Sequence, residues 1–241
     1  MEFRILGPLE VWQEGGEVSL GGPKPRALLA ALLLHPNEVV SADRLIDDLW
    51  GDDSPERAAA ALRVNVSRVR KALPPDVLAT RAPGYVIRIE PGALDLHRFE
   101  RLVDEARSLL ARGLAADASA RLRDALSLWR GPPLADFAYE SFAQTAIARL
   151  EEIRLAAVEL RIDADLALGR HDELVGELEA LVAEHPLRER PHMYLMTALY
   201  RSGRQAEALA AYQDARRTLV DGLGIEPSTA LQELERTILR Q

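Results

Sequence analysis

The sequence contains no cysteine, which excludes disulfides, thiolate metal sites and cysteine nucleophiles. It also lacks any run near the ~18 consecutive apolar residues that a membrane helix needs. The first ten residues, MEFRILGPLE, have no apolar stretch behind a basic flank, as a signal peptide would. We therefore expect a cytoplasmic protein without a membrane partner.

Patterns that carry catalysis or bind cofactors are missing as well. The segment GGPKPR (21–26) contains glycine and lysine, but not in the order of a phosphate-binding loop. The five histidines show no metal-ligand spacing, and the serine, histidine and acidic residues fall on no recognisable nucleophile turn. The sequence thus predicts no enzyme, no cofactor and no metal site.

The charge distribution is uneven along the chain. The 241 residues suffice for two domains of roughly 100 and 140 residues, each with its own core. The net charge of −8 disfavours nucleic acid as a partner, yet residues 57–88 hold seven arginines or lysines and one aspartate, a net charge of +6. Phosphate contacts act within a Debye length of ~8 Å, so such a segment can bind DNA on an acidic protein.

The first ninety residues alternate between short strand and helix patterns. Gly7-Pro8 and Gly15-Gly16 separate three predicted strands, at 3–7, 9–13 and 17–20. Predicted helices follow from Pro25 to His35, from a Ser41 N-cap to Gly51, and over 57–73. Two strand candidates, 77–81 and 85–89, flank Ala82-Pro83-Gly84. This order, with the basic residues in the last elements, predicts a winged helix.

The helix predicted over 57–73 is amphipathic. At 100° per residue its buried stripe consists of Leu62, Val66, Val69 and Leu73. The opposite face consists of Arg57, Ala60, Val64, Ser67, Arg68 and Lys71. A helix with such an outward face can enter the major groove, where arginine reads guanine.

From His97 onward the periodic segments read as helices, after a short predicted linker at 90–96. GRHDEL (169–174) matches GRQAEA (203–208) at an offset of 34 residues, the period of tetratricopeptide repeats. A weaker third copy begins at Gly113. We therefore predict a mainly α protein, with a winged helix-turn-helix (α+β) over residues 1–92 and an all-α tetratricopeptide-like domain over 93–241.

Motif order adds a family resemblance. LIDDLWG (45–51), VNVSRVRKAL (64–73) and TRAPGY (80–85) resemble the DNA-binding domain of OmpR-type response regulators. With GPLEVW, LDLHRFERL, LWRGPPLAD and ALYRSGRQAEALAAY, the whole chain resembles a Streptomyces antibiotic regulatory protein, whose second domain is the bacterial transcriptional activation domain.

The resemblance implies roles for individual residues. Arg68 falls on the base-contacting arginine, and Arg81 on the wing arginine that enters the minor groove. Asn65 and Ser67 fall where phosphate contacts are expected, and Trp50 on a tryptophan whose indole N–H meets a phosphate. Val64 can contact a thymine methyl group. The full predicted DNA-binding set is Trp50, Arg57, Arg63, Val64, Asn65, Ser67, Arg68, Arg70, Lys71 and Arg81.

Simpler interpretations exist for several of these residues. Trp50 can be a core residue between helices, and Arg57, Arg63 and Arg70 can form a solvated face. Tyr85 is better explained as hairpin core than as a DNA contact. Ala60 and Ala61 replace residues that often reach phosphates in OmpR-type regulators.

For the whole chain, the resemblance implies an activator of a secondary-metabolite operon. It would bind direct repeats near the −35 region as a homodimer and contact the RNA polymerase sigma and alpha subunits, associated with the nucleoid. Two alternatives are a tetratricopeptide-like scaffold that binds a peptide or small effector, and a repressor that blocks the promoter.

Overall fold

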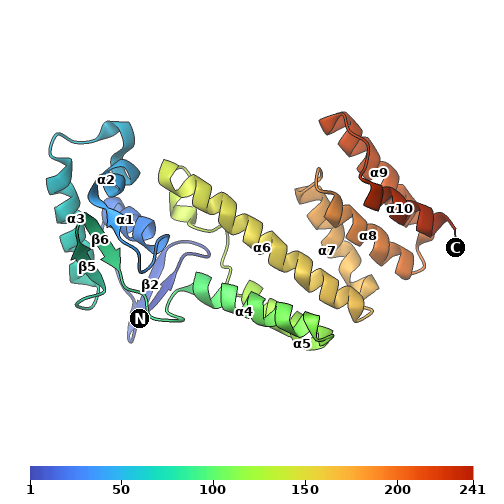
Figure 1. The fold of residues 1–241 in the computed structure, drawn as a ribbon, viewed down its shortest axis with the longest axis horizontal. Coiled ribbons are helices and arrows are strands. Elements are labelled where there is room, and N and C mark those ends of the chain that lie inside the picture. Colours follow the sequence, from blue (N-terminus) through green and yellow to red (C-terminus); the bar gives the residue numbers. More distant parts are fainter. Residues whose placement is uncertain (241) are drawn as a thin grey trace. The chain divides into compact units, whose positions relative to one another are not determined.

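The computed structural model describes residues 1–240 (Figure 1). Contacts divide them into two compact units, one of residues 1–104 with 123–157, the other of residues 105–122 with the chain from Val158 onward. These units follow contacts and do not coincide with the predicted division at residue 92, which stays a prediction. No helix within residues 1–240 is both long and apolar enough to cross a bilayer.

The first unit begins with an antiparallel meander of order β1-β2-β3. Its strands are β1 (Glu2–Arg4), β2 (Glu10–Gln13) and β3 (Gly16–Glu17). The predicted strands 3–7 and 17–20 were too long. The first ends early because the amides of Ile5 and Leu6 donate to the side chain of Asp95 and not to a neighbouring strand.

Helix α1 (Pro23–Leu33) is the centre of this unit's core. Every residue from Ala27 to Leu33 is buried, as expected for a helix surrounded on all sides. Helices α2 (Ala42–Trp50) and α3 (Ala58–Ala72) pack against it (Figure 1). The predicted N-cap is confirmed, because the Ser41 side chain accepts a hydrogen bond from the Arg44 amide.

A second antiparallel sheet, of order β4-β6-β5, forms the hairpin after α3. The hairpin strands are β5 (Leu78–Arg81) and β6 (Gly84–Ile87), and β4 (Val40–Ser41) joins them from the start of α2. The sequence did not predict β4. A β-carbon at Gly84 would lie 1.8 Å from the Val40 carbonyl oxygen, so this close strand approach requires glycine.

Residues 90–96 are not the free linker that the sequence predicted. The Phe3 amide donates to the Ala93 carbonyl at 2.7 Å, and Asp95, which is 2% exposed, accepts from the amides of Ile5 and Leu6 at 2.9 to 3.0 Å. Burial raises the pKa of the Asp95 carboxyl, although these backbone donors and the charge of Arg130 act in the opposite direction. The predicted linker therefore packs firmly on the N-terminal strands.

The LWRGPPLAD motif (128–136) also contacts residues 5–9, which follow β1. The Arg130 amide donates to the Leu6 carbonyl at 2.8 Å, and the Leu134 amide donates to the Ile5 carbonyl at 3.0 Å. Asp136 accepts from the Leu9 amide at 3.2 Å and pairs with Arg26. We call these contacts of Asp95, Arg130, Leu134 and Asp136 with residues 5–9 the latch.

The remaining chain is helical, which confirms the predicted fold class. Its elements are α4 (Asp95–Ala111), α5 (Ala115–Leu126), the 3-10 turn η2 (Ala135–Phe137), α6 (Ser141–Ala167), α7 (His171–Glu184), α8 (Glu189–Arg201), α9 (Gln205–Leu223) and α10 (Thr229–Leu239). A further 3-10 turn, η1 (Gly51–Asp53), follows α2.

The predicted repeat register is confirmed by turns and burial. Gly169 and Gly203 occupy the turns before α7 and α9 with φ of +79° and +77°, and Gly113 occupies the turn before α5 with φ of +75°. The residues five, nine and twelve positions after each of these glycines are buried. They are Leu174, Leu178, Leu181, Ala208, Tyr212, Ala215, Ala118, Leu122 and Ala125.

Candidate nucleic-acid interface

Helix α3 begins and ends where its sequence directs. Arg57 lies at its N-cap with φ of −114°, two residues after Pro55, whose carbonyl accepts a hydrogen bond from the Ala58 amide at 2.9 Å. Leu73 adopts an extended conformation because Pro74 follows and disfavours the helical region at the preceding residue. A proline therefore lies just outside each end of α3.

The two faces of α3 differ as the periodicity predicts. Leu62, Val66 and Val69 are at most 2% exposed. The opposite face carries the exposed residues Arg63, Val64, Ser67, Arg68 and Lys71. Val64 is 51% exposed, so an apolar side chain faces solvent amid cations.

Three basic side chains on the outer face of α3 form no ion pair within the described residues. Within residues 1–240, no ion pair joins Arg63, Arg68 or Lys71 to a carboxylate, and all three are exposed. Arg68 and Lys71 also line an open cleft of about 460 Å³ with Ser19, Gly21 and Gly22. This outer face of α3 therefore offers unpaired positive charge next to an open cleft, which suits an anionic partner.

The Arg70 side chain donates hydrogen bonds to strand β5. Its Nε donates to the Leu78 carbonyl at 2.9 Å and a terminal nitrogen donates to Thr80 Oγ1 at 2.7 Å. Its guanidinium also lies 5.9 Å from the centroid of the Tyr85 ring. Arg70 therefore joins α3 to the hairpin, and Tyr85 lies within that hairpin, as predicted.

Asn65 and Trp50 are placed differently from the exposed set. Asn65 is 6% exposed and its Nδ2 donates to the Ala61 carbonyl at 3.0 Å, one turn back in α3. A buried amide bonded in this way does not face a duplex. Trp50, at the end of α2, is half-buried, a position that suits both a core residue and a phosphate contact.

At the hairpin tip, Arg81 is exposed beside the exposed Ala82 and Pro83. Backbone pairing fixes this tip: Ser41 pairs with Gly84, and the Ala42 amide donates to the Pro83 carbonyl at 3.1 Å. The start of α2 therefore holds the wing in place. From the sequence, Gly84 is predicted only as a turn residue. The short apolar pair Val39-Val40 before Ser41 is the signal that could have indicated the additional strand.

The geometry defines a class: a winged helix whose exposed basic helix and wing precede a helical-repeat region, the arrangement of a DNA-binding transcriptional regulator. Comparison with known families agrees. Residues 15–87 match the family described as "Transcriptional regulatory protein, C terminal", and residues 94–239 match the "Bacterial transcriptional activator domain". The chain belongs to the Streptomyces antibiotic regulatory protein family of transcriptional activators, whose members are regulators and not enzymes.

Individual relatives cover the whole chain. It is 48% identical to the regulatory protein AfsR of Streptomyces coelicolor, of which it spans 24%, and 40% identical to DnrI of Streptomyces peucetius, of which it spans 92%. A solved structure of Mycobacterium tuberculosis EmbR in complex with a low-affinity phosphopeptide has a TM-score of 0.96 and 39% identity, over 100% of this chain and 65% of that one. The chain thus spans about a quarter of AfsR and about two thirds of EmbR.

Proposed function

We propose that this protein binds promoter DNA in a sequence-specific manner and activates transcription, with α3 in the major groove and the wing in the adjacent minor groove. The observation that carries the proposal is the exposed and unpaired Arg68 on the outer face of α3. An arginine there can donate two hydrogen bonds to guanine O6 and N7, worth about 1–3 kcal/mol of discrimination.

The other exposed residues supply the contacts that position the helix. Lys71 and Arg63 neutralise phosphates, Ser67 donates to a phosphate oxygen, and Val64 packs on a thymine methyl group. Arg57 reaches a phosphate at the start of the helix, and Trp50 does so through its indole N–H. Arg81 enters a narrow minor groove, where the negative potential is strongest.

Two members of the predicted set take other roles in this proposal. Asn65 stabilises α3 from its buried face, because its amide is bonded to Ala61. Arg70 orients the wing relative to α3 through Leu78 and Thr80, so it affects DNA binding by positioning Arg81.

At the level of the promoter, we propose that two copies bind side by side on direct repeats one helical turn apart, near the −35 region. They would contact the sigma and alpha subunits of RNA polymerase and activate a secondary-metabolite operon. Residues 1–92 would bind DNA and residues 93–241 would serve activation. The family membership and the relatives named above support this proposal.

Selection of bound duplexes from a random pool tests the proposal. We expect enrichment of a directly repeated motif with centres about 10–11 base pairs apart. Enrichment of a single site would retain DNA recognition but refute the paired arrangement. A pool that stays random after repeated rounds would refute sequence-specific binding.

A further inference from the structure

The loop that joins β3 to α1 lines the open cleft beside α3. It contributes Ser19, Gly21 and Gly22 to the lining, and all three are exposed. Leu20 of the same loop is only 4% exposed, so its side chain anchors the loop in the core of the first unit. The loop is therefore held beside the outer face of α3.

The cleft of about 460 Å³ is positively charged. Helix α3 contributes Arg68 and Lys71, neither of which is in an ion pair within residues 1–240. Among the described residues, no carboxylate and no aromatic ring lines this cleft. Sites for small organic ligands are lined mainly by apolar and aromatic side chains, whereas two unpaired cations attract an anion. The lining therefore suits a polyanion better than a small effector molecule.

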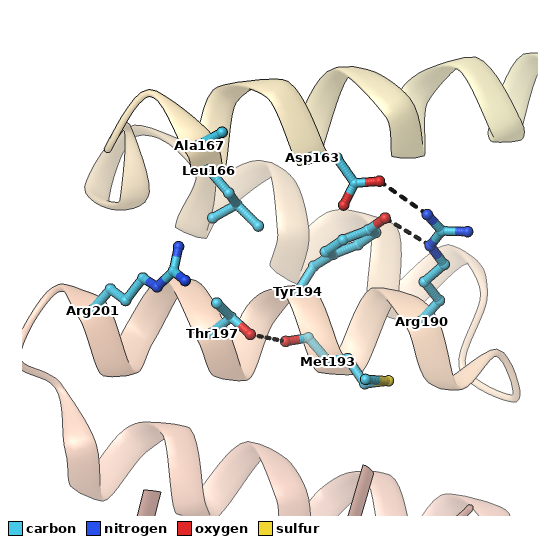
Figure 2. A pocket seen from close by; sticks show the side chains of 8 residues that line it. All are labelled: Asp163, Leu166, Ala167, Arg190, Met193, Tyr194, Thr197 and Arg201. Atoms are coloured by element: carbon cyan, nitrogen blue, oxygen red, sulfur yellow. Dashed lines mark hydrogen bonds and ion pairs between the residues drawn. The ribbon is translucent and has the colours of Figure 1, made fainter. Parts of the chain in front are cut away.

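A second open cleft, of about 440 Å³, lies along α6 and α8 in the other unit (Figure 2). It also presents arginines, but its lining includes the carboxylate of Asp163, which is 3.0 Å from Arg190. Arg190 Nε in addition donates to the Tyr194 hydroxyl at 2.6 Å. An anion would meet a carboxylate there. Of these two clefts, the one beside α3 is therefore the better anion site.

The loop adds hydrogen-bond donors that the protein does not use. Within residues 1–240, neither the Ser19 hydroxyl nor the amides of Gly21 and Gly22 donate a hydrogen bond. Backbone amides, serine hydroxyls and the cations of lysine and arginine are the groups that donate to the phosphate oxygens of DNA. One cleft thus combines all these kinds of phosphate donor.

Gly22 leaves its backbone accessible for no internal reason. Its φ of −70° and ψ of 179° suit any residue, and a β-carbon there would have no heavy atom within 4 Å. Gly21 differs, because its φ of +79° favours glycine. A glycine that neither conformation nor packing requires still permits the close approach of a ligand to the backbone. The bare chain at Gly22 therefore has room for a phosphodiester group.

We propose that the loop of residues 19–22 holds one phosphate of the DNA backbone against α3. The phosphate oxygens accept from the amides of Gly21 and Gly22 and from the Ser19 hydroxyl, and the Lys71 ammonium neutralises the charge. This inference rests on the proposed function, because it adds the loop to the same DNA-binding surface. Phosphate contacts carry no sequence information, so the loop sets affinity and the position of α3 but not base preference.

Gly22→Pro and Gly22→Ala together test the amide donor. Proline removes the N–H group at a φ that proline adopts, whereas alanine keeps it. We expect Gly22→Pro to weaken binding of the full chain to its selected duplex about tenfold, as for one lost hydrogen bond to a charged group. Gly22→Ala should lose less affinity than Gly22→Pro, and the base preference should stay that of the parent in both.

Ser19→Asp is an independent test that does not depend on how Gly22→Pro folds. It places a negative charge at an exposed position of the cleft and should weaken DNA binding at least as much as Gly22→Pro. Gln13→Glu is the matched control, because it makes the same change in net charge at an exposed position of β2 outside the cleft. Its affinity for DNA should stay close to that of the parent.

A methylphosphonate scan of the selected duplex locates the phosphate. Neutralising the phosphate that the loop holds should weaken binding by the parent protein. The same neutralised phosphate should have a much smaller effect on Gly22→Pro, because two changes to one contact are not additive. Additive effects at every phosphate would overturn the proposal.

The remaining outcomes separate this proposal from the proposed function. If the parent binds its selected site and both Gly22→Pro and Ser19→Asp bind it equally well, the loop proposal is overturned and the proposed function stands. If the parent selects no DNA, the proposed function fails first and the loop proposal with it. If Gly22→Pro loses binding of inorganic phosphate but keeps its DNA affinity, the cleft is a site for a free anion, which also overturns the proposal.

Discussion

Replacing Asp95 by alanine tests the latch that joins the N-terminal strands to α4. The Asp95 carboxylate accepts from the Ile5 amide at 2.9 and 3.0 Å and from the Leu6 amide at 3.0 Å. Ile5 and Leu6 are fully buried, so water cannot replace the lost acceptor. Asp95→Ala would therefore leave two backbone donors without a partner.

The size of the effect follows from these contacts. Each buried donor left unsatisfied costs about 1–3 kcal/mol, which gives about 2–6 kcal/mol for the pair. Burial of the carboxylate is itself unfavourable, as the raised pKa of Asp95 shows, and its removal returns part of that cost. We expect the free energy of unfolding of this unit to fall by about 3 kcal/mol, a large part of a typical total of about 5–15 kcal/mol.

Urea denaturation followed by tryptophan fluorescence measures this loss. The three tryptophans, Trp12, Trp50 and Trp129, all lie in the first unit, so the signal reports on that unit. Asp95→Asn, which keeps one acceptor oxygen, should lose less than Asp95→Ala. Asp52→Ala is the matched control, since Asp52 is an exposed acid of the same unit, in η1. A loss below 1 kcal/mol for Asp95→Ala would refute the importance of the latch.

Four further substitutions test the wing, the outer face of α3 and one histidine. Gly84→Ala should destabilise the first unit by about 2 kcal/mol or more in urea denaturation, because its β-carbon would overlap the Val40 carbonyl. Arg70→Ala should weaken DNA binding without changing its salt dependence, whereas Lys71→Ala should reduce the log–log salt slope by about 0.9 in a fluorescence anisotropy titration. Burial lowers the pKa of His35 in the folded state. The neutral imidazole therefore stabilises the fold above pH ~6.5, and this contribution is lost as the pH falls through the folded-state pKa. His35→Gln should reduce the decrease in unfolding free energy between pH 7 and 5.

Each of these changes has a control or a contradicting outcome. Gly22→Ala places a methyl group in open space and should lower the free energy of unfolding only slightly. An equally small loss for Gly84→Ala would contradict the close strand approach. An unchanged salt slope for Lys71→Ala would remove it from the phosphate contacts. A pH dependence that is the same with and without His35 would show that its burial does not matter for stability.

Much of the fold could be predicted because local patterns and tertiary packing agree there. The apolar stripe of α3, the Ser41 cap and the turn glycines at 169 and 203 are all local signals, and the structure contains each of them. The predicted end of the first strand and the predicted free linker at 90–96 were wrong for the same reason. Both depend on hydrogen bonds between residues about 90 positions apart, which leave no periodicity in the sequence.

The candidate site shows the same limit. Helical periodicity placed Arg68 and Lys71 on the outer face because their exposure depends only on the phase of α3. It could not show that Arg70 is bonded to the hairpin, since this depends on how β5 packs on the helix. Position matching to a family motif placed Asn65 at a phosphate, while its phase on α3 put it on the buried face.

The affinities of Arg68→Ala for the selected site and for random DNA, each compared with those of the parent protein, test whether α3 reads bases through Arg68. We expect a loss of about 1–3 kcal/mol on the selected site, relaxed preference at one base pair, and little change on random DNA. Lys71→Ala should weaken both by the same factor. An equal loss on both DNAs for Arg68→Ala would contradict the base-reading role.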